Sequence, residues 1–161
     1  VLEKARLISP KDINAITQLA LVYDGLKKYE ECDRLYEEGL KLDPTNATML
    51  NNYGYSLADR NIQIDRALEM ATKAVAAQPD NTSFLDTIGW VYFRLGDYKQ
   101  AEMYIKKAID KGEVSPVVHE HLGDVYYRMK DVERAMEQWK IALKMDEGNV
   151  SLKEKITRGS L

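Results

Sequence analysis

Apolar side chains recur three and four residues apart along most of the chain, a spacing that gathers them on one face of an α-helix. Two stretches show the pattern most clearly, one containing Ile88 and Tyr92 and the other Leu122 and Tyr126. The pattern therefore predicts a series of amphipathic helices, each with one buried face.

The two stretches also match each other residue by residue. The segment IGWVYFRLGDYKQAEMYIKKAI begins at Ile88, and LGDVYYRMKDVERAMEQWKIAL begins at Leu122 and continues in the same register without a gap. Two more copies lie upstream, and the nearer one has an extra residue in the turn within ADRNIQID. We therefore divide most of the chain into four repeats, at residues 13–46, 47–81, 82–115 and 116–149.

Small residues hold fixed places in every repeat. Four of them fall in the first predicted helix and four in the second: Ala20, Gly54, Gly89 and Gly123, then Cys32, Ala67, Ala101 and Ala135. Small side chains let two helices approach closely, and larger apolar side chains fill the remaining space. One helix pair cannot bury its apolar stripe alone, so the repeats are expected to stack.

Both ends of the chain continue the pattern. Residues 1–12 align with the later half of a second helix, which predicts the end of a truncated upstream repeat. Residues 150–161 keep helical spacing through Leu152 and Ile156, which predicts a C-terminal capping helix.

The period of about 34 residues and the recurring residue types resemble the tetratricopeptide (TPR) repeat, in which a W-x2-L-G-x2-Y pattern precedes A-x3-F and a closing Pro. Two departures are visible. The position of the pattern's Trp is occupied by Ile16, Leu50, Leu85 and His119. In the last two repeats, Glu113 and Glu147 replace the closing Pro. The resemblance implies an all-α fold, a right-handed α-α superhelix of antiparallel helix pairs.

Residues 50–145 more specifically resemble the C-terminal repeats of a group of bacterial TPR proteins. The similarity lies in the successive segments NNYGYSLADR, LDTIGWVYFRLG and HEHLGDVYYRMK. Members of that group are often exported in Gram-negative bacteria, some as outer-membrane lipoproteins. The resemblance implies a periplasmic or outer-membrane-associated protein, with the cytoplasm as the alternative.

Composition narrows the choice of partner. The net charge of -3 and the pI near 5.5 give no general attraction to a polyanion, so nucleic acid is not expected as a partner. No apolar run approaches the roughly 20 residues of a membrane span, so we expect no direct membrane insertion of this fragment.

Residues with catalytic or metal-binding potential have structural explanations. His119 and His121 lie two places apart on a predicted helix and point about 200° apart, so they are not expected to share a metal ion. Cys32 occupies a small-residue place, where burial would raise the pKa of its thiol. Because the glycines occur singly, no phosphate-binding loop is indicated. We predict a non-catalytic protein without a cofactor.

In the TPR fold the first helix of each pair lines the inner, concave face. Carried onto this sequence, that face combines aromatics expected to be exposed with side-chain amides and charges of both signs, a set suited to a bound peptide. The nominated contacts are Asn51, Asn52, Tyr55, Trp90, Phe93, Arg94, Tyr127 and Arg128. The alternative is that Trp90 and Tyr55 only pack between adjacent first helices.

The sequence thus predicts a protein-interaction scaffold that holds a partner peptide or domain in this groove. Two other functions stay open. One is self-association, with a homodimer formed through apolar Leu2, Ala5 and Leu7 at the N-terminal edge. The other is regulation of an enzymatic domain outside the fragment.

Overall fold

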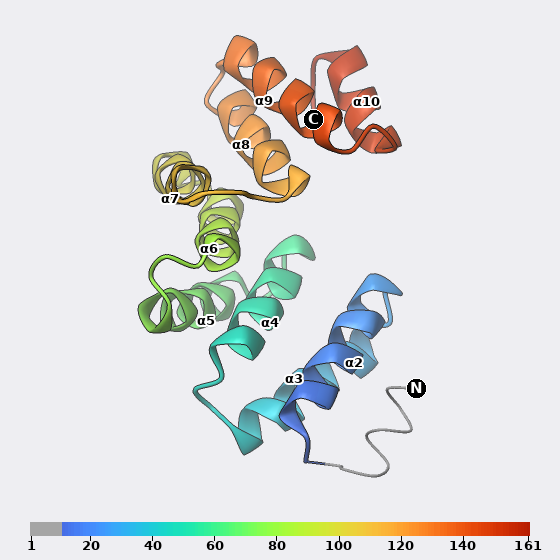
Figure 1. The fold of residues 1–161 in the computed structure, drawn as a ribbon, viewed down its shortest axis with the longest axis vertical. Coiled ribbons are helices and arrows are strands. Elements are labelled where there is room, and N and C mark those ends of the chain that lie inside the picture. Colours follow the sequence, from blue (N-terminus) through green and yellow to red (C-terminus); the bar gives the residue numbers. More distant parts are fainter. Residues whose placement is uncertain (1–10) are drawn as a thin grey trace. The chain divides into compact units, whose positions relative to one another are not determined.

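The computed structural model describes residues 11–161, which form nine helices and no strand (Figure 1). The expected homodimer edge at Leu2, Ala5 and Leu7 lies outside the described residues. Within residues 11–161 no helix has the length and apolar character that crossing a bilayer requires.

Each predicted repeat contains one helix pair, and a single helix follows the last pair. We call the earlier member of a pair the first helix and the later one the second helix. The helices are α2 (Ile13–Gly25), α3 (Tyr29–Leu42), α4 (Ala47–Asp59), α5 (Ile64–Ala77), α6 (Thr82–Leu95), α7 (Tyr98–Lys111), α8 (Pro116–Arg128), α9 (Val132–Met145) and α10 (Val150–Arg158).

Contacts divide the chain after Ala77 into two compact parts. In the N-terminal part, α2 packs on α3, α4 packs on α5, and α3 also contacts α4. In the C-terminal part, α6 packs on α7 and α8 on α9, while α7 contacts α8 and α9 contacts α10. In this part, α7 therefore lies between α6 and α8, and α9 lies between α8 and α10.

Helix ends follow from local sequence. Asp97 and Asp131 each accept a hydrogen bond from the backbone N–H three residues on, which satisfies a donor left over at the helix start. Ser115 precedes Pro116 at the start of α8, but its hydroxyl makes no capping bond. Proline at the first helical position removes one of the backbone donors that have no partner within the helix.

The tight turns between first and second helices contain a residue in the left-handed backbone region. Lys27, Gly96 and Lys130 occupy this place, with φ values of 57°, 81° and 69°. Glycine adopts this conformation without a steric penalty, whereas lysine is strained there.

The predicted small-residue contacts are present in both parts. A Cβ atom added at Gly54, Gly89 or Gly123 would lie 3.2, 3.2 or 3.1 Å from a backbone carbonyl oxygen of the second helix. Those oxygens belong to Ala67, Ala101 and Ala135, which are fully buried. The pairs are therefore held with backbone close to backbone, as the sequence predicts.

Buried and half-buried polar contacts join α6 to α8 and α8 to α10 in the C-terminal part. The imidazole Nδ1 of His121 on α8 lies 3.0 Å from Asp86 Oδ1 on α6. Lys155 on α10, one repeat length after His121, donates from Nζ to Glu120 Oε1 at 2.7 Å and to Asp124 Oδ2 at 2.9 Å. His121 and Lys155 thus hold equivalent positions, and each pairs with an acidic residue one helix pair earlier in the chain.

These surroundings change the protonation of His121. Burial disfavours the charged imidazolium, but Asp86, Asp124 and Glu120 favour it more strongly, and the pKa of His121 is raised. Burial also raises the pKa of Asp124, although Lys155 and the Trp139 indole N–H favour its charged form.

We predict that Gly123→Ala destabilises the chain by about 1–3 kcal/mol, because the added methyl group overlaps the buried Trp139 ring. Urea unfolding followed by circular dichroism measures the loss. The control is Gly25→Ala, where the new Cβ meets nothing within 4 Å. That change should be neutral or stabilising by up to about 1 kcal/mol, and equal losses in both variants would contradict the packing argument.

We also predict that stability falls as the pH rises above about 6.5, the ordinary pKa of histidine. The folded pKa of His121 lies above its unfolded value, so the contribution of the imidazolium–Asp86 pair is complete at lower pH. It is lost as the pH rises through the folded pKa.

Urea unfolding at several pH values measures this slope. His121→Asn should flatten it, while His119→Gln, which leaves the Asp86 pair in place, should not. A slope that survives His121→Asn would assign the dependence to other groups.

Candidate functional site

The nominated residues of the N-terminal part lie on α4. Asn51 is buried, with 6% of its surface exposed, and its Nδ2 donates to Asn52 Oδ1 at 3.2 Å. The Oδ1 atom of Asn51 is buried without a hydrogen-bond partner in the described chain. Asn52 and Tyr55 are half-buried. Asn52 and Tyr55 therefore have surface available to a ligand, while Asn51 lies beneath.

The expected exposure of Trp90 and Phe93 is wrong. Only 6% of Trp90 and 7% of Phe93 are accessible, because α8 lies beside α6 and covers this face. The Trp90 indole stacks on the His121 imidazole at a centroid distance of 4.0 Å, and on the Phe93 ring at 4.6 Å. For Trp90, packing between adjacent first helices is what the structure shows.

The accessible nominated residues of the C-terminal part lie toward the ends of α6 and α8. Arg94 is half-buried, with its guanidinium carbon 4.8 Å from the centre of the Trp90 ring. Arg128 is exposed and Tyr127 half-buried. Because Arg94 and Arg128 are one repeat length apart, they hold the same place in successive repeats, near the C-terminal end of each first helix.

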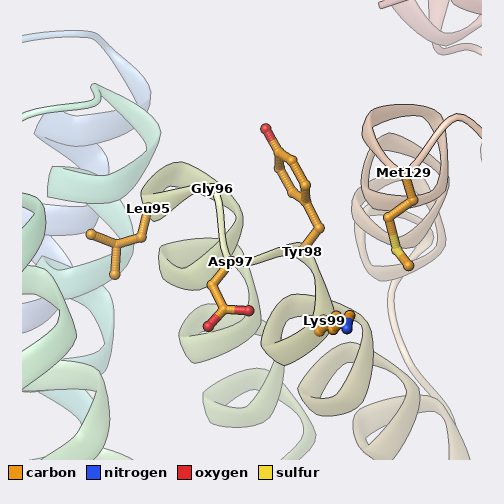
Figure 2. A pocket seen from close by; sticks show the side chains of 6 residues that line it. All are labelled: Leu95, Gly96, Asp97, Tyr98, Lys99 and Met129. Atoms are coloured by element: carbon orange, nitrogen blue, oxygen red, sulfur yellow. The ribbon is translucent and has the colours of Figure 1, made fainter.

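A hollow of about 600 Å³ is lined in part by Leu95 and Met129, the residues that directly follow these arginines in the sequence (Figure 2). Figure 2 shows the Tyr98 side chain standing between the α6–α7 turn and Met129 at the end of α8. Apolar and aromatic groups contribute much of the lining, and Asp97 and Lys99 add one charge of each sign. The lining residues are Leu95, Gly96, Asp97, Tyr98, Lys99 and Met129.

None of these lining residues was nominated from the sequence. Five of them lie around the turn between α6 and α7, and Met129 directly follows α8. At such places the repeat pattern predicts where helices begin and end, and it does not indicate a binding face. One signal was present: Leu95 and Met129 are apolar, hold equivalent places in successive repeats, and each directly follows a nominated arginine. Leu95 is 41% exposed, and Leu26 at the equivalent place of the first repeat is 61% exposed.

The residues with catalytic potential do not form a reactive site. His119 Nδ1 lies 2.9 Å from Gln138 Oε1 on α9, whereas His121 faces Asp86 on α6, so the imidazoles have different neighbours. Cys32 is buried as predicted, and burial together with Asp24 and Asp33 raises the pKa of its thiol to about 12. No group of three or more metal-ligating side chains occurs within residues 11–161.

Sequence comparisons give a consistent family. The tetratricopeptide repeat model matches residues 13–46 and 83–110. The chain is 30% identical over 115 residues to the TPR repeat-containing protein PA4667 of Pseudomonas aeruginosa, covering 71% of this chain and 19% of that protein. It is 26% identical over 132 residues to the type IV pilus assembly protein PilF of the same organism, covering 81% of this chain and 52% of PilF.

The fold is also found among solved structures. The TPR protein TTC0263 of Thermus thermophilus superposes with a TM-score of 0.82 at 20% identity, covering 98% of this chain and 86% of that chain. The predicted all-α fold class of paired TPR helices is thereby confirmed. Repeat period, helix pairs and relatives together identify the chain as a tetratricopeptide repeat protein, a helical scaffold of the kind that supports protein–protein interaction.

Proposed function

We propose that this chain binds a partner polypeptide at the C-terminal ends of α6 and α8. An apolar side chain of the partner enters the hollow beside Leu95, Tyr98 and Met129, and acidic groups of the partner pair with Arg94 and Arg128. The observation that carries the proposal is the hollow itself. Two of its lining residues, Leu95 and Met129, directly follow Arg94 and Arg128, which hold equivalent places in successive repeats.

The buried residues of this region act as support rather than as contacts. Trp90 is stacked between His121 and Phe93, and His121 is paired with Asp86, so each ring has a neighbour that fixes its orientation. A surface that is already ordered loses less conformational entropy when a partner binds. Trp90 and Phe93 thus keep the place of Arg94, while Arg94, Tyr127 and Arg128 touch the partner.

The amides of α4 serve a related purpose in the N-terminal part. Asn52 and Tyr55 are half-buried, and an asparagine side chain can pair with both the N–H and the C=O of a bound main chain. We assign them to a second contact with the partner, and Asn51 to holding the Asn52 amide in place through their hydrogen bond.

The compartment that we propose is the bacterial envelope. It rests on the similarity to PilF, whose name describes a type IV pilus assembly protein. The chain spans 19% of PA4667 and 52% of PilF, so any further activity of a longer protein stands outside this proposal.

The test is a selection of peptides from a random displayed library against the whole chain. We expect selected peptides to carry acidic residues beside a large apolar one, and to lose at least about ten-fold in affinity with R94E/R128E, roughly 1.4 kcal/mol. Isothermal titration calorimetry measures the loss. Two exposed cations away from the hollow supply the control, R34E/K41E, which changes the net charge equally.

Unchanged affinity in R94E/R128E, or equal loss in R34E/K41E, would remove this surface from the proposal. Met129→Ser distinguishes the hollow from the charges, since it removes apolar lining and leaves both arginines. We expect it to weaken binding in high salt and low salt alike, whereas the effect of R94E/R128E should shrink as salt rises.

A further inference from the structure

The last helix, α10, corresponds to the first helix of a fifth repeat. It begins at Val150, one repeat length after Pro116 begins α8. It packs on α9 through the fully buried Leu152, and Lys155 pairs with acids of α8 as His121 pairs with an acid of α6. α10 therefore holds the place of a first helix as well as the contacts of one.

One face of α10 lacks the cover that this place has elsewhere. Ile88 on α6 and Leu122 on α8 are only 2% and 3% exposed, because a second helix packs over each of them. Ile156 holds the same place on α10, and it is only half-buried. Within residues 11–161 no second helix follows α10.

A hollow of about 500 Å³ occupies the corresponding space between α9 and α10. Leu143 and Ile156 supply its apolar surface, and charged residues surround them. The lining residues are Lys140, Leu143, Lys144, Glu147, Lys153 and Ile156. Three cations against one carboxylate give this hollow a net positive charge, in contrast to the negative charge of the whole chain.

The three lysines are available for pairing. All three are exposed, and none makes an ion pair with another residue of the described chain. The place of Lys153 is informative, because its equivalent on α8 is His119, which contacts Gln138 of the second helix α9 at 2.9 Å. A side chain at this place therefore reaches a helix packed on the first helix.

The residue at the glycine place limits how close such a helix can come. Gly89 and Gly123 allow a second-helix carbonyl to lie within about 3.2 Å of where a Cβ would be, whereas α10 has Thr157 there. A helix on α10 therefore rests farther out than α7 or α9 does on its partner. It makes contact mainly through large side chains that reach into the hollow.

We propose that the hollow between α9 and α10 docks an amphipathic helix of a partner protein with an apolar stripe and acidic flanks. A large apolar side chain of this helix fills the space between Leu143 and Ile156, and its acidic residues pair with Lys140, Lys144 and Lys153. This surface is separate from the hollow at the ends of α6 and α8, so either assignment can fail alone.

The chain itself supplies two matched probe peptides, both second helices of equal length. Residues 29–42, with Cys32→Ala, carry five acidic and two basic residues, whereas residues 98–111 carry two acidic and four basic ones. Both peptides are acetylated and amidated, labelled with a fluorophore and titrated with the whole chain. Backbone amide shifts in ¹⁵N–¹H spectra locate any binding.

We expect the acidic peptide to bind at least about ten-fold more tightly than the basic one at low salt, and the difference to shrink at about 1 M salt. Amide shifts should centre on α9 and α10. K140E/K144E/K153E should reverse the preference, while the surface control R34E/K41E/K73E should keep it. Ile156→Ser should weaken both peptides without changing which one binds better.

Three results would overturn the proposal. They are equal binding of the two peptides, no binding of either at millimolar concentration, and shifts confined to α2–α4, where residues 29–42 pack in the intact chain. Shifts at the ends of α6 and α8 would instead assign the acidic peptide to the surface proposed above. Circular dichroism confirms that each variant keeps its helices before any of these results is used.

Discussion

The structure depends on how closely the two helices of each pair approach. At Gly54, Gly89 and Gly123 the backbone of the first helix lies so near the second that a Cβ atom would be only 3.1–3.2 Å from a carbonyl oxygen, closer than an ordinary contact. Because the helices are so close, the buried side chains of Ile105 and Trp139 pack directly against Gly89 and Gly123. Without this closeness, the second helix would stand off, and the surface that it offers to the next repeat would move with it.

A second set of contacts specifies how successive first helices lie against each other. Apolar packing alone tolerates sliding, whereas the pairing of Asp86 with His121 and of Glu120 with Lys155 requires particular atoms to meet. Buried charges stabilise a fold weakly when they are paired, but leaving one unpaired is costly. In the C-terminal part these pairs therefore disfavour wrong arrangements of α6, α8 and α10 more than they add stability.

The repeat pattern predicted the fold well because it records packing. The positions of Gly89 and Ala101 require a small residue in every repeat, because the two helices approach closely there. A single sequence therefore shows the same requirement four times. Binding residues are less visible, because the repeat pattern does not show which side chains a ligand contacts. Trp90 illustrates the difficulty: its inward direction followed from its place in the helix, but its burial depends on His121, which another repeat supplies.

Both hollows were missed for a related reason. One lies at the turn that contains Tyr98 and the other at the junction with α10, and each is a space that several elements leave open together. A repeat pattern identifies the side chains that pack in the core, but it does not indicate which spaces between helices stay empty. Lys155 did carry a usable signal, because it repeats the place of His121 and so identifies α10 as a first helix.

The left-handed residues between first and second helices have a consequence for engineering. Gly96 adopts its conformation freely, but Lys27 and Lys130 hold the same geometry against a steric penalty. Their side chains are exposed, so the geometry is imposed by the helices on either side. Replacing the lysine by glycine in either turn would remove this strain. Thermostability can therefore be raised there by a single substitution, without altering the core or either binding surface.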